Sequence, residues 1–275
     1  MYKSIDFVEL QNSTALEALK STCQNFIKKD GKYKSNGCGV FVKIDNSHFL
    51  LSAAHVFKEN DCSIYVNTTQ HGLITLGGER NVSIALSDQK EDRIDSLIIK
   101  LDQATVDLLD GSYDYLKQSQ LGINHELLEM PMYISVGFPA SKSKLSYFEK
   151  NKINSTPYSF LTRVADESTY EQLSCNMNAT IIVQYFKNKI RDSLTNKLEV
   201  GPDLYGISGS GLWFTPFQNI NRDIEIEKKL VAIMTEWSTK NRNYIIGTRI
   251  DFFTELIRKK YCLGIEQSAL VQIVF

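Results

Sequence analysis

Short apolar runs separated by turn residues dominate the chain from residue 37 to about residue 101. Each run has the length and the β-branched and aromatic content of a strand. Six runs share this pattern: CGVFVKI (38–44), HFLLSAAHVF (48–57), CSIYVNT (62–68), HGLITL (71–76), RNVSIALS (80–87) and DSLIIKL (95–101). Because no helical pattern of ten or more residues lies between them, the spacing favours a β-barrel or sandwich over an α/β fold.

The second half of the chain is again rich in strand-like runs. They are PMYISVGFP (131–139), NATIIVQYF (178–186), SGLWF (210–214), KLVAIMTEW (229–237) and NYIIGTRI (243–250). Residues 102–127 are less regular and predict a linker with a short helix. The polar stretch 140–177 predicts mostly loop, and loops of that length are usually functional or mobile.

Helical spacing occurs near both ends of the chain. In STALEALKSTCQNFIKK (13–29), Thr14 and Glu17 fit a capping box. The apolar residues of this segment recur at a helical period: Leu16, Leu19, Cys23, Phe26 and Ile27. We therefore predict a helix over 13–29, ended by the turn residues DGKYKSNG, and a second, amphipathic helix over 251–261 (DFFTELIRKKY).

Composition and charge narrow the classes of partner. The 275 residues are 43% hydrophobic, which is ample for a sizeable core. The net charge of −1 gives no electrostatic footprint for nucleic acid, and no basic run suggests an anionic membrane. No apolar stretch approaches the roughly 20 residues that cross a bilayer. The first ten residues, MYKSIDFVEL, lack the features of a signal peptide, so we expect a cytoplasmic protein.

The cysteines agree with a cytoplasmic location, and the sequence has no metal-ligand motif. Five cysteines are widely spaced without a CxxC pair: Cys23, Cys38, Cys62, Cys175 and Cys262. An odd, scattered set predicts free thiols in a reducing cytosol. There is no HExxH, paired Cys/His spacing, EF-hand loop or P-loop, so we expect neither a metal nor a cofactor.

Three short stretches carry candidate chemistry. The run LLSAAHVF (50–57) places His55 behind Ala53 and Ala54, where a lone histidine is ordinarily a core residue bonded to a carbonyl. Asp95 opens the run DSLIIKL, where a lone aspartate is ordinarily a turn or strand-start residue. The cluster YGISGSGLWF (205–214) can direct backbone N–H groups at one point, although Gly-Ser turns are common.

Taken in chain order, SAAH, DSLIIKL and GISGSG resemble the signatures of the trypsin-like (chymotrypsin-fold) serine peptidases of the intracellular and bacterial type. The resemblance covers roughly residues 35–260. It implies a mainly β fold of two six-stranded antiparallel β-barrels with an N-terminal and a C-terminal helix. The implied division is an N-terminal extension with the helix over 1–34, a first barrel over 35–115, and a second barrel with the closing helix over 116–275, forming one peptidase unit.

The resemblance also implies a mechanism and a set of residues. The chain would be a serine endopeptidase that cleaves protein or peptide substrates through an acyl-enzyme, with His55 as the general base and Ser208 as the nucleophile. Asp95 would orient the imidazole, which we expect to be enclosed for that purpose. The backbone N–H groups of Gly206 and Ser208 would form the oxyanion hole.

Other hydrolase classes fit less well. An α/β-hydrolase needs a histidine after the nucleophile and a glycine at 210, where this chain has serine. All four histidines precede Ser208: His48, His55, His71 and His125. Subtilisin order would need Asp45, and the serine context differs. Viral relatives of the trypsin-like fold use a cysteine nucleophile, but residue 208 is serine. The alternative that remains is a catalytically inactive trypsin-like domain that binds proteins.

Two departures from the secreted relatives affect activation. Ile207 stands where those relatives carry the aspartate that pairs with a new N-terminus, so that ionic activation is absent. Val56 replaces a cysteine of a common disulfide, in agreement with the cytoplasmic prediction. We therefore expect the loop 140–177, or an activating partner protein that touches it, to order the oxyanion hole.

Specificity rests on weaker signals. The resemblance places the pocket floor at Pro202, with Asp203 beside it, and the substrate-pairing strand at Thr235, Glu236 and Trp237. Asp203 and Glu236 would select Lys or Arg at the cleaved position, and two solvated carboxylates are the alternative. Trp237 stands where relatives keep a glycine at the pocket entrance, so either the correspondence shifts by one residue or the pocket is narrowed.

Overall fold

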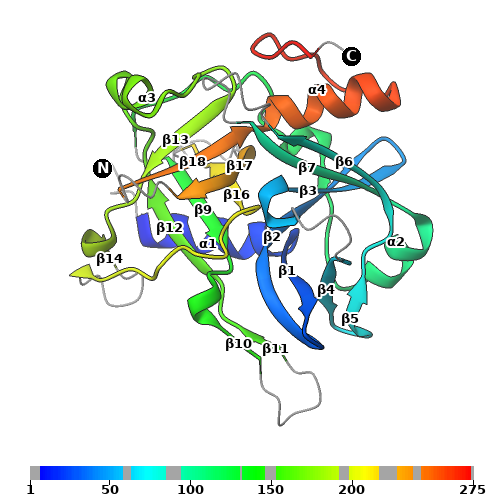
Figure 1. The fold of residues 1–275 in the computed structure, drawn as a ribbon. Coiled ribbons are helices and arrows are strands. Elements are labelled where there is room, and N and C mark those ends of the chain that lie inside the picture. The colour runs from blue at the N-terminus through cyan, green and yellow to red at the C-terminus, as the bar shows by residue number, and fades with distance from the viewer. Residues whose placement is uncertain are drawn as a thin grey trace, which may run out of the picture.

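The computed structural model describes residues 7–57, 63–84, 94–130, 132–145, 153–191, 198–216, 228–237 and 243–273. These residues form two large antiparallel sheets, two small two-stranded sheets and four α-helices. In Figure 1 the first sheet, coloured blue to teal, lies beside the second, coloured green to orange. The mainly β fold predicted from the sequence is confirmed. The described residues contain no helix long and apolar enough to cross a membrane.

The first sheet has eight strands. Seven follow the order β5-β4-β1-β2-β3-β7-β6, and β8 pairs with β2 in parallel. Their bounds are β1 (Thr22–Lys29), β2 (Lys32–Ile44), β3 (Ser47–Ser52), β4 (Tyr65–Thr68), β5 (Gly72–Thr75), β6 (Gly78–Ile84), β7 (Asp95–Leu101) and β8 (Leu116–Lys117). The run Val40–Phe41–Val42 of β2 is continuously apolar because its alternate side chains enter two different core clusters.

The second sheet has six strands in the order β12-β9-β16-β17-β18-β13. Their bounds are β9 (Tyr133–Gly137), β12 (Tyr158–Thr162), β13 (Thr180–Gln184), β16 (Gly211–Phe214), β17 (Lys229–Trp237) and β18 (Tyr244–Arg249). Just after β12, Arg163 O accepts a hydrogen bond from Gln184 N (3.1 Å), and Ala165 N donates to Ile182 O (2.8 Å). Backbone hydrogen bonds therefore also join the residues that follow β12 to β13, the strand at the other end of this path.

Four helices and two hairpins complete the described chain. The helices are α1 (Phe7–Leu19), α2 (Gln103–Leu109), α3 (Glu167–Leu173) and α4 (Ile250–Tyr261), and the hairpins are β10 (Ser143–Leu145) with β11 (Ile153–Ser155) and β14 (Ile190–Arg191) with β15 (Leu198–Glu199). Helix α1 packs on the second sheet, where Gln11 donates to Ser159 O (3.0 Å). Helix α4 lies over the junction of the two sheets in Figure 1, and its Phe253 shares one core cluster with Leu51 and Trp213.

The helix predicted over 13–29 is wrong in its second half. Helix α1 ends at Leu19, and residues 22–29 form strand β1 between β2 and β4. Asn25, fully buried, donates its side-chain N–H to Cys38 O (2.6 Å). Pairing with two neighbouring strands outweighs the helical spacing of the apolar residues, since tertiary contacts routinely override local preference.

The loop predicted over 140–177 is also wrong in large part. This stretch contains β10, β11, β12 and α3, while residues 146–152 lie outside the described part of the chain. Strand β12 buries Phe160 and turns Ser159 toward α1, so its polar positions also have contacts. The first sheet has eight strands, so the prediction of two six-stranded barrels is not confirmed. The C-terminal helix, the short helix after residue 102 and the later strand runs are confirmed.

Candidate active site

His55 and Asp95 lie at the same edge of the first sheet. Strand β3 ends at Ser52, and His55 follows in a 3₁₀ turn (Ala54–Phe57). Asp95 is the first residue of β7, which pairs antiparallel with β3 so that Ser52 faces Leu97. Because the end of one strand meets the start of its antiparallel neighbour, the fold brings these two distant residues together.

Asp95 holds His55 through both of its carboxylate oxygens. The backbone N–H of His55 donates to Oδ1 (2.9 Å), and the ring Nδ1 contacts Oδ2. The backbone N–H of Asp95 in turn donates to Thr248 Oγ1 (3.3 Å) on β18 of the second sheet. These bonds fix the orientation of the imidazole, and its Nε2 makes no hydrogen bond to any residue that the structure describes.

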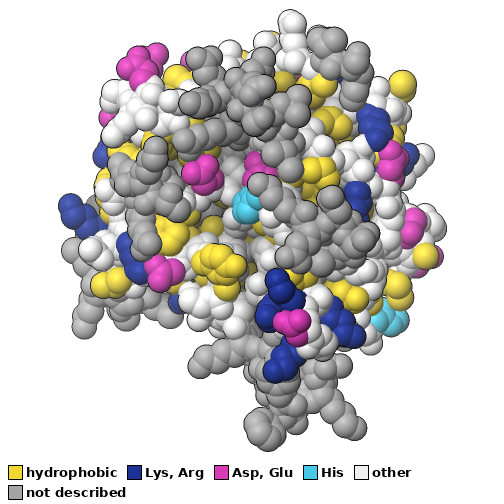
Figure 2. All heavy atoms as spheres, in the orientation of Figure 1, with side chains coloured by type: hydrophobic (Ala, Val, Ile, Leu, Met, Phe, Trp, Pro, Cys, Tyr) yellow, Lys and Arg dark blue, Asp and Glu magenta, His cyan; other side chains and the backbone are white. Residues whose placement is uncertain are grey.

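The imidazole is not enclosed as the sequence suggested. The His55 side chain is 37% exposed and the Asp95 side chain 20% exposed. The preceding Ala53 and Ala54 are buried, because they continue the core-facing part of β3. The orientation therefore comes from the carboxylate rather than from burial. Figure 2 shows, near the middle of the face in view, a histidine with acidic side chains beside it and hydrophobic side chains around them.

Ser208 lies in the loop before β16, between two glycines with left-handed backbones. Gly206 and Gly209 both have φ of +89°, which L-residues with a Cβ rarely adopt. A Cβ added at Gly209 would lie 2.0 Å from Cys38 O, so the loop packs directly on β2. Gly209 N also donates to Met234 O (2.7 Å) on β17. The glycines thus allow the loop to fit tightly between the two sheets.

The backbone of Ser208 lies next to the residue that follows His55. Cys38 N donates to Ser208 O (2.8 Å). A Cβ built on Gly37 would lie 2.8 Å from Ser208 O and also 2.8 Å from Val56 Cγ1. The Ser208 carbonyl and the Val56 side chain therefore border the same point on β2, which brings the serine loop close to the histidine turn.

Two neighbouring strands of the second sheet connect Asp95 and Ser208. The Ser208 hydroxyl donates to Thr235 O (3.2 Å) on β17, and Asp95 N donates to Thr248 on β18. Thr248 faces Ile233, two residues from Thr235. The pairing is irregular between Met234 and Glu236, where Thr235 lies, and the two anchor residues are on adjacent strands of the same sheet. No hydrogen bond joins Ser208 to His55, both of which the structure describes.

The peptide planes around Ser208 leave two N–H groups available. Tyr205 O accepts a hydrogen bond from Ala140 N (2.7 Å), and Ile207 O accepts one from Ser210 N (2.9 Å). In a trans peptide the N–H points opposite to the carbonyl. The two bonds therefore fix the directions of the Gly206 and Ser208 N–H groups. Neither N–H donates to any residue in the described ranges.

Apolar packing holds the residue that precedes the serine. Ile207 is 2% exposed and belongs to a core cluster with Leu204, Leu212 and Met234. A carboxylate at this position would be buried among hydrocarbon without a cation, at a cost of several kcal/mol. The loop is therefore fixed by hydrophobic contacts in place of an ion pair.

The residues expected to set specificity have separate environments. Asp203 is 55% exposed in its side chain and pairs with Lys187 (2.8 Å). Pro202 O accepts a hydrogen bond from the Tyr185 hydroxyl (2.7 Å), and Tyr185 meets Trp237 edge-on at 6.2 Å between ring centroids. Thr235 is buried, whereas Glu236 is exposed. Within the described ranges, no group of three His, Cys, Asp or Glu side chains could hold a metal ion.

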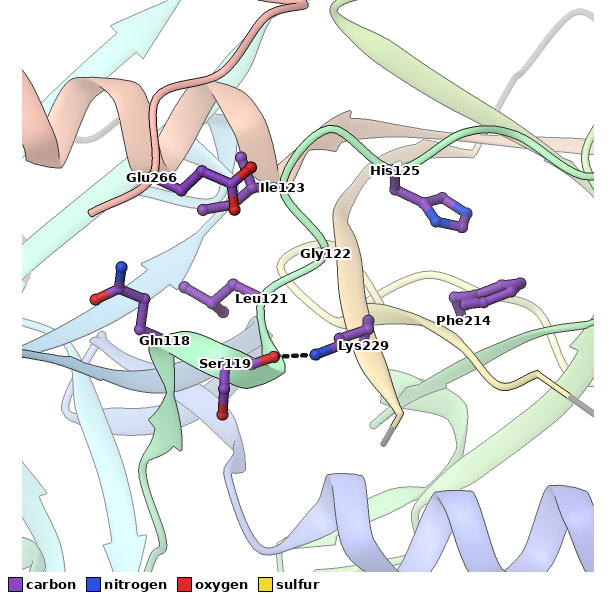
Figure 3. A pocket seen from close by; sticks show the side chains of 9 residues that line it. All are labelled: Gln118, Ser119, Leu121, Gly122, Ile123, His125, Phe214, Lys229 and Glu266. Carbon is purple, nitrogen blue, oxygen red and sulfur yellow. Dashed lines mark hydrogen bonds between the residues drawn. The ribbon is translucent and has the colours of Figure 1, made fainter. Parts of the chain in front are cut away.

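A cavity of about 640 Å³ lies apart from these residues, between the 118–125 segment, the second sheet and the C-terminal tail. Figure 3 shows its lining residues: Gln118, Ser119, Leu121, Gly122, Ile123, His125, Phe214, Lys229 and Glu266. Burial, together with Arg249, lowers the pKa of His125 to about 4. Its Nε2 bonds to the Tyr133 hydroxyl (2.9 Å), and Lys229 Nζ donates to Ser119 O. These polar groups already have partners, so this cavity is the weaker candidate.

Three contributors to the candidate site were missed by sequence reasoning: Cys38, Ala140 and Thr248. Ala140 and Thr248 act through backbone or hydroxyl contacts that span more than 60 residues, and the sequence carries no signal for them. The placement of Cys38 between Gly37 and Gly39 was a usable signal, because glycines on both sides permit close approach of another segment.

Neither the models of protein families nor the curated protein sequences contain a match to the chain.

Proposed function

We propose that the protein is a serine endopeptidase of the trypsin-like type, acting on protein or peptide substrates. The observation that carries the proposal is the carboxylate–imidazole pair of Asp95 and His55 beside a serine loop whose two N–H groups are available. A base oriented by a carboxylate, a serine and paired N–H donors are the parts that acyl transfer needs. All of them lie at the junction of the two sheets.

In the proposed reaction His55 Nε2 takes the proton of the Ser208 hydroxyl as that oxygen attacks the scissile carbonyl. The serine must first turn from Thr235 O toward His55. Asp95 accepts from Nδ1 and stabilises the imidazolium, which then gives its proton to the leaving amine. The N–H groups of Gly206 and Ser208 hold the oxyanion, and each such donor is worth about 3–4 kcal/mol. Water repeats the steps to release the acyl group, and no metal or cofactor takes part.

The second sheet supports the chymotrypsin-type architecture as part of the proposal. The hydrogen bonds between the end of β12 and β13 are those expected where a six-stranded sheet closes into a barrel. The eight strands of the first sheet would correspond to the other barrel with additional strand pairing.

The contact of Ala140 with Tyr205 supports the activation hypothesis. Ala140 begins the 140–177 stretch, and its N–H fixes the peptide plane that orients the Gly206 N–H. The ordering of the oxyanion hole would then depend on this stretch, and a partner protein that moves it would change the activity. A cytoplasmic location fits the free thiols of the four described cysteines: Cys23, Cys38, Cys175 and Cys262.

Labelling by a fluorophosphonate probe tests the proposal. Wild type should be labelled at Ser208, and Ser208→Ala and His55→Ala should not be labelled. Ser210→Ala is the matched control, because its hydroxyl is fully buried and has no hydrogen-bond partner among the residues that the structure describes. That variant should react as fast as wild type. Equal labelling of wild type and Ser208→Ala would refute the proposed nucleophile.

A protein-binding module without turnover is the second candidate. Its support is the hydrogen bond of the Ser208 hydroxyl to Thr235 O, because one hydroxyl proton cannot be donated to Thr235 and His55 at once. Wild type that is folded, as judged by a cooperative thermal transition, but is not labelled by the probe would favour this function.

Selection of Lys or Arg by Asp203 and Glu236 remains part of the proposal. The ion pair of Asp203 with Lys187 opposes it, since the carboxylate already has a cation. A peptide library cleaved by wild type and by Lys187→Ala tests the point. Cleavage after basic residues that increases in Lys187→Ala would support selection by Asp203, and profiles without a basic preference would reject it.

A further inference from the structure

Cys38 touches the serine loop at two points from the opposite sheet. Its backbone N–H donates to Ser208 O (2.8 Å), and its thiol donates to Gly206 O (3.4 Å). Cys38 lies on β2 of the first sheet, whereas the loop leads into β16 of the second. One residue therefore bonds the carbonyls on both sides of Ile207.

The sulfur itself is held in place. Phe138 N, just after β9, donates to Cys38 Sγ (3.2 Å), so the sulfur accepts from one segment and donates to another. The Cys38 carbonyl accepts from Asn25 Nδ2 and from Ser52 Oγ, both at 2.6 Å. With every polar atom of Cys38 bonded, the residue has little freedom to shift relative to β1, β3 or β9.

The hydrogen bond to the Gly206 carbonyl matters because Gly206 has no Cβ, so rotation about its φ and ψ meets little steric hindrance. Its preceding peptide is held by the bond from Ala140 N to Tyr205 O. Its following peptide is held at the carbonyl by the Cys38 thiol and at the N–H by Leu204 O, which accepts from Ile207 N (3.0 Å). With both planes fixed, φ and ψ of Gly206 are determined, and so is the direction of its N–H. Without the thiol, the following plane would keep only the bond of Ile207 N, and Gly206, whose φ is +89°, could then shift at small steric cost.

Burial suits the thiol to this role and argues against a role as a nucleophile. Cys38 is completely buried, and desolvation raises the pKa of its thiol to about 12. The sulfur therefore keeps its proton, which is the proton donated to Gly206, and it is out of reach of soluble oxidants.

We propose that Cys38 is a positioning residue for the oxyanion hole, acting on Gly206 through its thiol and on Ser208 through its backbone N–H. This inference rests on the proposed peptidase function. It assigns to a buried cysteine a part in the alignment of groups that would bind the developing oxyanion, although the side chain touches no substrate.

Cys38→Ala and Cys38→Ser test the role of the thiol, with Cys23→Ala as the matched control. Cys23 is equally buried in the first sheet, and its thiol bonds to Asn25 Oδ1 (3.4 Å) and not to the loop. Asn25 bonds Cys38 O through its other polar atom, Nδ2, so this bond remains in Cys23→Ala. We expect Cys38→Ala to lower kcat about 10- to 100-fold with KM within about twofold, because oxyanion bonds form in the transition state. Cys38→Ser, which keeps a donor and an acceptor, should recover most of the loss. Cys23→Ala should leave kcat within about twofold.

Amide hydrogen exchange supplies a readout that does not need activity. The loop N–H groups of Gly209 and Ser210 are bonded to Met234 O and Ile207 O. Exchange of the peptide that contains them should be at least about tenfold faster in Cys38→Ala and unchanged in Cys23→Ala. Unchanged exchange, or an equal loss of kcat in both alanine variants, would overturn the positioning role. If wild type is inactive but exchange is still faster in Cys38→Ala than in wild type, the positioning role of Cys38 is retained and the peptidase function is rejected.

Discussion

Asp95→Asn tests the link between the hydrogen bonds of the carboxylate and the chemistry of His55. Asp95 accepts from two N–H groups of the same residue, the backbone N–H at Oδ1 and the ring Nδ1 at Oδ2. Asparagine has nearly the same shape but only one acceptor oxygen. The backbone N–H cannot change its role, so the amide oxygen must remain opposite it. The amide NH₂ is then opposite the imidazole.

This arrangement forces the wrong tautomer on the histidine. Facing a donor, Nδ1 must become an acceptor, and the ring proton moves to Nε2. An imidazole that carries its proton on Nε2 cannot take the proton of Ser208. The opposite orientation of the amide places NH₂ against the backbone N–H and leaves a donor unpaired, at a cost of about 1–3 kcal/mol. This second orientation keeps the competent tautomer, but its cost makes it the minor one, and it lacks the carboxylate charge that stabilises the imidazolium.

The expected loss is about 10⁴-fold in kcat, as tautomer defects of this kind produce, or about 5.5 kcal/mol in the activation free energy. The unfolding free energy should change much less, because asparagine preserves the volume and the contact to the backbone N–H. Asp102→Asn is a matched control, since Asp102 caps α2 through Thr105 N (2.8 Å) and lies at the end of the same strand that Asp95 begins. This variant should keep full activity.

The assay combines the rate of fluorophosphonate labelling with ¹⁵N NMR of the histidine ring. The wild-type spectrum should show the proton on Nδ1 of His55, and the Asp95→Asn spectrum should show it on Nε2. The reasoning fails if Asp95→Asn keeps more than a tenth of the wild-type rate. It also fails if the labelling rate falls while the ring proton of His55 stays on Nδ1, because the loss of rate would then have another cause.

Three further predictions follow from contacts around the candidate site and around the cavity that His125 lines. Ile207→Ala should lower the free energy of unfolding by about 2–5 kcal/mol in urea titrations, because it opens a cavity in the core, and a change below about 1 kcal/mol would contradict the packing. The pKa of His125 lies at about 4 in the fold and higher when unfolded, so stability should fall by roughly 2 kcal/mol between pH 6.5 and pH 4, allowing for partial exposure of the ring. His125→Gln should remove this pH dependence, and equal profiles of stability against pH for wild type and His125→Gln would contradict the role of His125. Ala140→Pro deletes the N–H that binds Tyr205 O, at a position where Pro139 has ψ of 136° and tolerates a following proline. Labelling should fall at least about tenfold in Ala140→Pro but not in Ala140→Ser, and equal rates in the two variants would contradict the role of this bond.

The strands were predictable where the apolar pattern was strong. Runs such as 95–101 and 229–237 are continuous because both of their faces are buried, and the structure gives β7 and β17 the same bounds. Strand β1 was not predictable, because Gln24 and Asn25 are buried polar residues whose hydrogen bonds lie outside the segment. Chance helical spacing of Cys23 and Phe26 then favoured the wrong element.

The candidate site was predictable in its side chains but not in its supports. His55, Asp95 and Ser208 could be selected because their local contexts resemble known signatures, and the fold brings the first two into contact. The exposure of His55 could not be predicted, because it depends on how the turn after β3 meets solvent. The bonds of Cys38 and Thr248 to the site join different sheets, and residue patterns along one segment do not encode such pairings.

Hydrogen bonds between the two sheets hold both the histidine and the serine parts of this site. Asp95, on the first sheet, bonds to Thr248 of the second, while the loop of Ser208, which leads into the second sheet, bonds to Cys38 of the first. A relative shift of the two sheets would therefore strain both the carboxylate that holds the histidine and the loop that holds the serine. The core cluster shared by Leu51 and Trp213 limits such a shift. The geometry of the site is consequently a property of the packing between the two sheets, which explains why residues distant in sequence, including a buried cysteine, can determine it.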